Sequence, residues 1–204
     1  MKIYFSPASP FVRKCMAVAH EAGLAGQIEK LPSAANPVNR DRTIIAENPL
    51  GQVPTMITDD GLALYDSRVI CEYLDDLGDA KLFPAAGPAR WQALADQALA
   101  DGMLGAALLA RYEVSLRPEA HRWSNWIDGQ MGKVADGLAR FEQRAASLGD
   151  RLDIGTITLG CALGYLDFRY PDYDWRASHP GCAQWYAVFS ERASMRETTP
   201  EARP

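Results

Sequence analysis

The hydrophobic pattern of this chain changes once, near residue 80, and this change constrains the possible fold more than any other feature. Before it, short apolar runs typical of buried strands alternate with amphipathic helical patterns. Strands are expected at 2–5, 27–31, 55–58 and 63–65, and helices at 10–22 and 67–77. The second of these helices is expected to end at Gly78 and to have an inner face of Val69, Ile70, Tyr73 and Leu74. After the change near residue 80, the pattern is helical throughout. The sequence therefore predicts an α/β domain followed by an all-α helical bundle.

The stretch 79–88 carries Pro84, Gly87 and Pro88, so it is expected to link a domain at 1–78 to a helical domain at 89–204. Helices are expected at 89–116, from Pro118 to about 146, at 154–168 and after His179-Pro180. The helix at 154–168 is apolar on nearly all sides, which places it at the centre of the bundle. The polar tail after Ser194 is expected to fray.

Composition excludes several classes of function. The chain has 204 residues and a net charge of −5 without a basic run, which argues against nucleic acid as a partner. No apolar run approaches a membrane span and no signal peptide begins the chain, so we expect a soluble, cytoplasmic protein with no membrane partner. The four cysteines are far apart and show no zinc spacing, which favours reduced structural thiols and no metal. Cys15, for example, shares an apolar helical stripe with Phe11 and is expected in the core.

The most informative local segment runs from Ser6 to Lys14, directly after the first strand. Ser9 stands where a helix N-cap is expected and Pro10 stands at the first helical position, where its missing N–H costs nothing. One hydroxyl is therefore held at the positive end of a helix, beside free backbone N–H groups. Such a place stabilises an anion. Taken alone, Ser9 is more often an ordinary cap than a catalytic group.

Two further motifs follow along the chain: Val53-Pro54 before a hairpin, then Asp66-Ser67 at the start of a helix. With the Ser6–Lys14 segment they resemble the thioredoxin-like half of cytosolic glutathione S-transferases, specifically bacterial serine-type sequences similar to tau and omega members. The stretch Cys161–Arg169 is also similar to bacterial homologues, so the resemblance covers nearly the whole chain. It implies a thioredoxin-like N-terminal domain, an all-helical C-terminal domain, glutathione as co-substrate and a homodimer.

The resemblance implies that the Ser9 hydroxyl donates a hydrogen bond to the sulfur of glutathione. The hydroxyl is too weakly acidic to serve as a strong base, but it can favour thiolate over thiol, and the thiolate is the nucleophile. Omega-like sequences carry cysteine here, so serine argues for conjugation rather than thiol transfer. Ser6 is the reserve candidate, and Tyr4 is a third because some transferase classes use a tyrosine near the first strand.

The same resemblance implies the glutathione ligands. The Val53–Pro54 bond is expected to be cis, which turns the Val53 backbone toward the cysteinyl backbone of the peptide. Gln52 stands where many relatives have lysine and is expected to meet the glycyl carboxylate. Asp66 is expected to meet the α-ammonium, and Ser67 the α-carboxylate of the γ-glutamyl end.

The electrophile is expected between the loop before the first helix and the first long helix, near Ala8, Phe11, Met103, Leu104, Leu108 and Arg111. The resulting hypothesis is an alkyl or aryl transferase in which the glutathione thiolate attacks an electrophilic carbon. Two alternatives remain on the same fold. One is a non-catalytic glutathione-binding or interaction protein; the other is a glutathione-dependent isomerase, dehalogenase or peroxidase.

The start of the expected central helix departs from the family pattern. Relatives place Ser or Thr at the cap and Asp three residues later, whereas here Asp153 precedes Thr156. Because Asp is also a good cap, the reciprocal pairing is expected to survive in reversed order.

Overall fold

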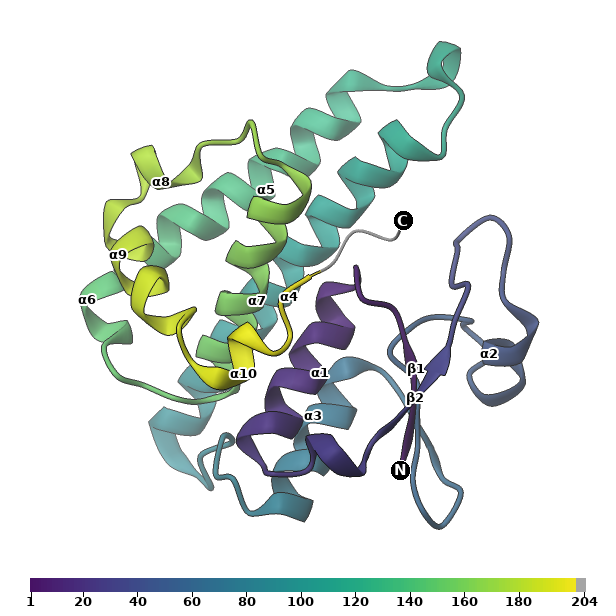
Figure 1. Cartoon of the computed structure of the whole chain (residues 1–204). Helices are drawn as coiled ribbons and strands as arrows, with labels where there is room; N and C mark the ends of the chain where they lie inside the picture. Colours follow the sequence, from purple (N-terminus) through teal and green to yellow (C-terminus); the bar gives the residue numbers. More distant parts are fainter. Residues whose placement is uncertain (201–204) are drawn as a thin grey trace. The chain divides into compact units, whose positions relative to one another are not determined.

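The computed structural model describes residues 1–200, which form two compact units (Figure 1). The first unit is Met1–Arg90 together with the segment from Arg192 onward, and the second is Trp91–Glu191. The sequence assigned that last segment to the helical domain. In the structure, Glu21 holds it to the first unit by accepting hydrogen bonds from Arg192 Nε and Nη2, each at 3.0 Å.

A four-stranded mixed sheet organises the first unit. Its order is β2-β1-β3-β4; β1 and β2 are parallel, and the other neighbours are antiparallel. The strands are β1 (Lys2–Phe5), β2 (Glu29–Pro32), β3 (Met56–Ile57) and β4 (Ala63–Leu64). All four predicted strands therefore form, and β3 and β4 are shorter than expected because only two residues of each pair in the ladder.

Helices cover both faces of this sheet: α1 and α3 lie on one side and α2 on the other (Figure 1). The helices are α1 (Pro10–Glu21), α2 (Arg42–Glu47), α3 (Ser67–Gly78) and α10 (Ala193–Arg196), with a 3-10 turn at Ala25–Gln27. Cys15 is fully buried, as expected, and its Sγ lies 3.8 Å from Cys71 Sγ where α1 packs on α3. Neither α2 nor α10 was expected from the sequence, since both are too short to show a helical period.

Two details of α3 differ from expectation. Val69, expected on the inner face, is 47% exposed, whereas Ile70 and Leu74 are fully buried. Gly78, expected to stop the helix, is its last residue, and Asp79 adopts the left-handed conformation at φ 48° instead. A Cβ on Gly78 would lie 2.6 Å from the Ala22 carbonyl oxygen, so glycine is required here by close packing rather than by a turn.

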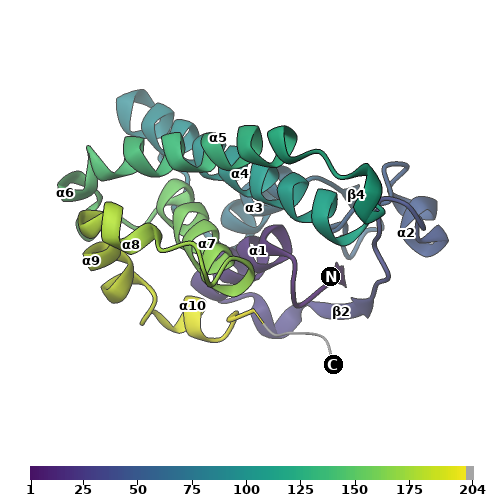
Figure 2. The ribbon, with the colours of Figure 1, turned by 90° about the horizontal axis from the view of Figure 1, so that it is seen from above.

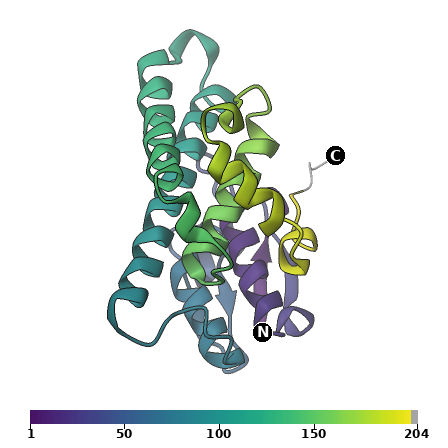
Figure 3. The same ribbon diagram turned by 90° about the vertical axis from the view of Figure 1, so that its left-hand side faces the viewer.

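The second unit is a helical bundle, in which α4 and α5 run side by side (Figures 2 and 3). Its helices are α4 (Gly87–Ser115, which begins in the first unit), α5 (Ser124–Glu142), α6 (Ala145–Leu148), α7 (Ile154–Arg169), α8 (Trp175–Ser178) and α9 (Pro180–Phe189). Every residue of α7 from Ile154 to Leu166 is buried, which confirms it as the central helix. Asp153 accepts from Thr156 N and donates its own N–H to Thr156 Oγ1, both at 3.0 Å, so the reversed cap forms as predicted.

Other boundaries needed correction. Pro118 precedes only a 3-10 turn, Glu119–His121, and α5 begins six residues later than expected, at Ser124. The linker at 79–88 is partly core, because Leu82 is 1% exposed and Phe83 9%. The tail after Ser194, expected to fray, is held at Met195, which is 1% exposed and whose carbonyl oxygen accepts from Arg13 Nη2 at 3.1 Å. Residues 201–204 of that tail lie outside the described part.

Helix α4 is long and apolar enough to cross a membrane by length and composition alone, but half of that stretch is buried inside the protein. Within it, Asp96 forms ion pairs with Arg144 at 2.6 Å and Arg151 at 3.2 Å. The core helix of a folded bundle can have the same length and composition, and the buried residues of α4 match that role.

Candidate functional site

The three predicted glutathione-site motifs meet at one edge of the sheet. β1 runs toward this edge and leads into the loop before Ser9. β3 is antiparallel to β1, with Met56 opposite Ile3, so Pro54 enters the sheet at the same edge. β4 is antiparallel to β3, so the chain leaves β4 there and reaches Asp66. The topology therefore brings together segments far apart in the sequence.

Ser9 caps α1 and keeps a free proton donor. Its Oγ accepts from the Val12 backbone N–H at 3.3 Å, and its backbone is extended, as at an N-cap. A hydroxyl that accepts one hydrogen bond can still donate its own proton. The side chain is partly exposed, so a ligand atom can reach it.

The turn before β3 presents an unpaired backbone edge. The Val53–Pro54 bond is cis, as the resemblance implied. Within residues 1–200, the Val53 N–H and C=O form no hydrogen bond. Such an edge can pair with an extended peptide as an added strand would. The Gln52 side chain is exposed beside it.

Two buried residues hold this turn in place, and sequence reasoning gave them no role. Thr55 Oγ1 donates to the Gln52 carbonyl oxygen at 2.8 Å, and Asn48 Nδ2 donates to Thr55 Oγ1 at 2.8 Å. The motif Asn48-Pro49-Leu50-Gly51 was visible in the sequence, but the bond from Asn48 to Thr55 depends on how the chain folds back.

Asp66 and Ser67 begin α3 as expected. Asp66 caps the helix by accepting from Arg68 N at 3.0 Å, and it also accepts from Arg68 Nη2 at 2.8 Å. The hydrogen bonds from Arg68 hold the pKa of the Asp66 carboxyl below its usual value, although burial opposes this. The Asp66 side chain remains 50% exposed. Arg68 was not expected as its partner, although the two residues are nearly adjacent.

Ser67 is 3% exposed, and its hydroxyl forms no hydrogen bond with any residue of the described chain. The residue as a whole is buried, but its hydroxyl oxygen keeps some contact with solvent. At the first turn of a helix it can serve an anionic ligand together with nearby backbone N–H groups.

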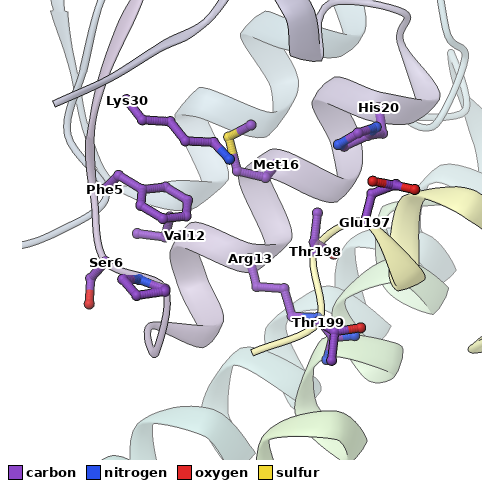
Figure 4. A pocket seen from close by; sticks show the side chains of 11 residues that line it. Phe5, Ser6, Val12, Arg13, Met16, His20, Lys30, Glu197, Thr198 and Thr199 are labelled. Atoms are coloured by element: carbon purple, nitrogen blue, oxygen red, sulfur yellow. The ribbon is translucent and has the colours of Figure 1, made fainter. Parts of the chain in front are cut away.

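A cavity of about 160 Å³ lies in the first unit, between α1, the end of β1, β2 and residues 197–199 (Figure 4). Ser6, the reserve candidate, lines this cavity together with Arg13, His20 and Lys30. None of Ser9, Gln52, Val53, Pro54, Asp66 and Ser67 does. The cavity is therefore separate from the motifs that meet at the sheet edge.

Tyr4 is engaged elsewhere. Its hydroxyl donates to the Thr43 carbonyl oxygen at 3.1 Å. Burial, with the charges of Glu47 and Asp41, raises the pKa of the phenol above its usual value. A phenol with a raised pKa and a committed proton is a poor donor to a thiolate.

The predicted electrophile-pocket residues are divided between the units. Ala8 and Phe11 lie on either side of Ser9 in the first unit, and both are half-buried. The other four lie on α4. Met103 and Leu104 are buried there, and Leu108 and Arg111 are half-buried. No group of three or more His, Cys, Asp or Glu side chains within residues 1–200 is placed to hold a metal ion.

Comparisons with known proteins agree with this architecture. The N-terminal domain of glutathione S-transferase matches residues 8–77, and its C-terminal domain matches residues 124–187. The uncharacterized GST-like protein YibF of Escherichia coli is 30% identical over 205 residues, which cover 98% of each chain.

Two solved structures of similar proteins contain glutathione or a glutathione conjugate. A glutathione transferase family member from Pseudomonas fluorescens Pf-5, with bound glutathione, is 44% identical at a TM-score of 0.96, covering 98% of this chain and 99% of that one. A structure of a family member from the same organism with bound S-(propanoic acid)-glutathione is 43% identical at a TM-score of 0.91, with the same coverage. The order of elements, the two matched domains and these full-length relatives place this chain in the glutathione S-transferase family.

Proposed function

We propose that this protein is a glutathione transferase that stabilises the glutathione thiolate with Ser9 and joins it to an electrophilic carbon. Glutathione would lie along the sheet edge, paired with the Val53 backbone. Its γ-glutamyl end would meet Asp66 and Ser67, and its glycyl end Gln52. The observation that carries the proposal is the meeting of these segments at one edge, each with an unpaired or exposed group.

The chemistry of each group suits the part of the peptide assigned to it. A carboxylate suits an ammonium, an unpaired hydroxyl at a helix start suits a carboxylate, and a free backbone edge suits a peptide bond. Full-length relatives that bind glutathione support the same ligand here.

Ser9 would act by hydrogen bonding rather than by proton abstraction. A donor that meets thiolate better than thiol lowers the pKa of the bound thiol, and the helix N-terminus adds to this effect. The proton then leaves to solvent and the thiolate attacks the electrophile.

The family is generally cytosolic, which supports the cytoplasmic location that we propose.

The test is a set of substitutions at Ser9 with glutathione and a panel of halide, epoxide, enone and hydroperoxide substrates. We expect Ser9→Ala to raise the pKa of the bound thiol and cut turnover about 10-fold or more, while glutathione affinity changes little. Ser9→Thr keeps the hydroxyl and is expected to retain activity. Ser9→Cys is expected to lose conjugation and gain thiol-transferase activity, since a cysteine at a helix start has a lowered pKa.

The controls separate the alternatives. Wild-type conjugation rates in both Ser9→Ala and Ser9→Cys would leave Ser9 as a cap only, and Ser6→Ala would then test the reserve candidate. A wild type that binds glutathione but converts no substrate would favour a non-catalytic protein. Activity confined to hydroperoxides or to halides would identify a peroxidase or a dehalogenase.

A further inference from the structure

The cavity beside α1 has no part in the proposed function (Figure 4). Its walls come from α1, the end of β1, β2 and residues 197–199, all of which belong to the first unit. It is lined neither by Ser9 nor by any predicted glutathione ligand, and Ala8 and Phe11 of the predicted electrophile pocket do not line it either. A ligand in this cavity would therefore be additional to glutathione and the electrophile.

Arg13 places a buried positive charge against the cavity. The side chain extends from α1 toward the 197–199 segment (Figure 4), and the residue is 6% exposed. Its Nη2 donates to the Met195 carbonyl oxygen at 3.1 Å, whereas its Nε and Nη1 are buried without a hydrogen-bond partner. Within residues 1–200 the guanidinium forms no ion pair. Burying a charge is costly when no opposite charge accompanies it, so the cavity adjoins a cation that lacks an anion.

A second cation, Lys30, lies at the rim of the cavity. It is exposed, and its Nζ lies 4.6 Å from the centre of the Phe5 ring. No carboxylate in the described part of the chain pairs with it. Glu197 carries the one negative charge among the lining residues, and it is exposed. The two cations exceed this carboxylate, and protonation of His20 can only add positive charge.

The hydroxyls of the 197–199 segment do not compete with these cations for an anion. Thr198 Oγ1 donates to the Ser194 carbonyl oxygen at 2.7 Å, and Thr199 Oγ1 donates to the Arg196 carbonyl oxygen at 2.8 Å. Their protons are therefore committed to the backbone. The free donors that line the cavity belong to the cationic side chains.

The rest of the wall is apolar and the space is small. Its apolar side chains come from the end of β1, the loop after it and α1: Phe5, Pro7, Val12 and Met16. An apolar cavity of about 150 Å³ takes up benzene. This cavity, at about 160 Å³, therefore has room for one ring.

We infer that the cavity binds a small aromatic carboxylate, with its charge toward Arg13 and Lys30 and its ring against Phe5, Val12 and Met16. The inference does not rest on the proposed function. Because Arg13 is buried, its charge acts on the carboxylate through surroundings of low dielectric constant, which strengthens the attraction. The ring gains by leaving water for the apolar wall.

The first test uses benzoate and its neutral amide, benzamide, with the whole wild-type protein. The two probes have nearly the same shape, and only benzoate is charged. In NMR titrations we expect benzoate to bind about 10-fold more tightly than benzamide or better, as for charged hydrogen bonds. The backbone signals that shift should belong to residues 5–7, 12–20, 30 and 197–199. Acetate should bind more weakly than benzoate, because it lacks the ring.

Substitutions separate a ligand-binding role of the cations from a structural one. Lys30→Gln should weaken benzoate binding several-fold and leave benzamide binding unchanged. Arg13→Gln should weaken it about 10-fold or more, while glutamine can still donate to the Met195 carbonyl oxygen. Glu197→Gln removes the opposing carboxylate and should strengthen binding about 2-fold. The matched control is Lys2→Gln, at an exposed lysine of β1 outside the cavity, which should change nothing.

Urea melts show whether each variant is folded. If Arg13→Gln does not fold, the opposite effects expected of Lys30→Gln and Glu197→Gln decide the outcome, since both residues are exposed. Equal binding of benzoate and benzamide, shifts at other residues, or unchanged benzoate binding in Lys30→Gln and Glu197→Gln would overturn the inference.

Titrations in saturating glutathione distinguish this cavity from the glutathione site. We expect the benzoate Kd to change by less than about 2-fold, because separate sites without coupling bind independently. Competition between the two ligands would overturn the inference and leave the proposed function standing. A wild type that binds benzoate in the cavity but binds no glutathione would instead refute the proposed function.

Discussion

At the scale of single residues, the Asp66 carboxylate is positioned by Arg68 and stays accessible to a ligand. It caps α3 through Arg68 N and is paired with the Arg68 guanidinium at 2.8 Å, yet half of its side chain is exposed. A ligand ammonium can therefore join this pair without displacing the cap.

We predict that Asp66→Ala weakens glutathione binding by about 1–3 kcal/mol, because the ligand ammonium loses its charged partner. The same change removes a helix cap and is expected to lower the free energy of unfolding by about 0.5–2 kcal/mol. Asp66→Asn is the matched control: asparagine caps as well as aspartate but carries no charge, so affinity should fall while stability is kept. Calorimetry and urea melts measure the two effects, and unchanged affinity in both variants would remove Asp66 from the site.

At the scale of helices, close approach of α7 to α4 depends on one glycine. A Cβ on Gly155 would lie 2.6 Å from Asp96 Cβ and 2.8 Å from the Ala93 carbonyl oxygen, so backbone would have to move. On α5, a Cβ on Gly137 would meet the Met103 side chain at 2.5 Å, and that side chain is flexible. The two glycines therefore face different kinds of neighbour.

We expect Gly155→Ala to lower the free energy of unfolding by about 1–3 kcal/mol through overpacking. Gly137→Ala is the comparison: Met103 can adopt another rotamer and alanine favours the helix, so the change should stay within about 1 kcal/mol. Denaturant melts of both variants check this. Equal losses in the free energy of unfolding would mean that the α4 backbone at Ala93 shifts as easily as the Met103 side chain changes rotamer.

At the scale of the whole molecule, carboxylates join distant segments in both units. Glu21 accepts from Arg192 and Ser194 in the first unit. Glu142 accepts from the Gly181 and Cys182 N–H groups at the start of α9 in the second. Burial alone would raise the pKa of each carboxyl, but these hydrogen bonds outweigh it and lower both values below the usual 4.5.

This direction sets the pH dependence of stability. Because the folded-state pKa lies below that of the unfolded chain, the unfolded chain binds more protons in acid. The stabilisation is complete above about pH 5 and is lost as pH falls through the folded pKa values. Urea melts should show a nearly constant free energy of unfolding from about pH 7 to 5.5 and a fall below about 4.5. Glu142→Gln should make that fall shallower, whereas Glu191→Gln, at an exposed position, should leave it unchanged.

We also predict a homodimer in which Arg68, Glu72 and the 89–99 face of α4 contribute. Trp91 in this stretch is 68% exposed, which is unusual for so large an apolar side chain. Light scattering at micromolar concentration should give the mass of two chains. Trp91→Glu should shift it toward one chain, whereas Val188→Glu, at another exposed apolar position, should not. A wild-type mass of one chain would refute the dimer.

The sequence by itself determined the features that depend on near neighbours along the chain. The caps at Ser9 and Asp153, and the apolar character of α7, follow from residues within a turn or two, so reading the chain was enough. It also placed the cis bond at Val53–Pro54, through the motif shared with the family.

Only the tertiary structure decided which groups meet across the chain. The bond from Asn48 to Thr55 and the attachment of Arg192 to Glu21 depend on chain reversals and helix packing. The exposure of Val69 and the need for glycine at position 78 were misjudged for the same reason. The sequence shows which side chains a helix carries, but burial and partners are decided by the surfaces that pack against it.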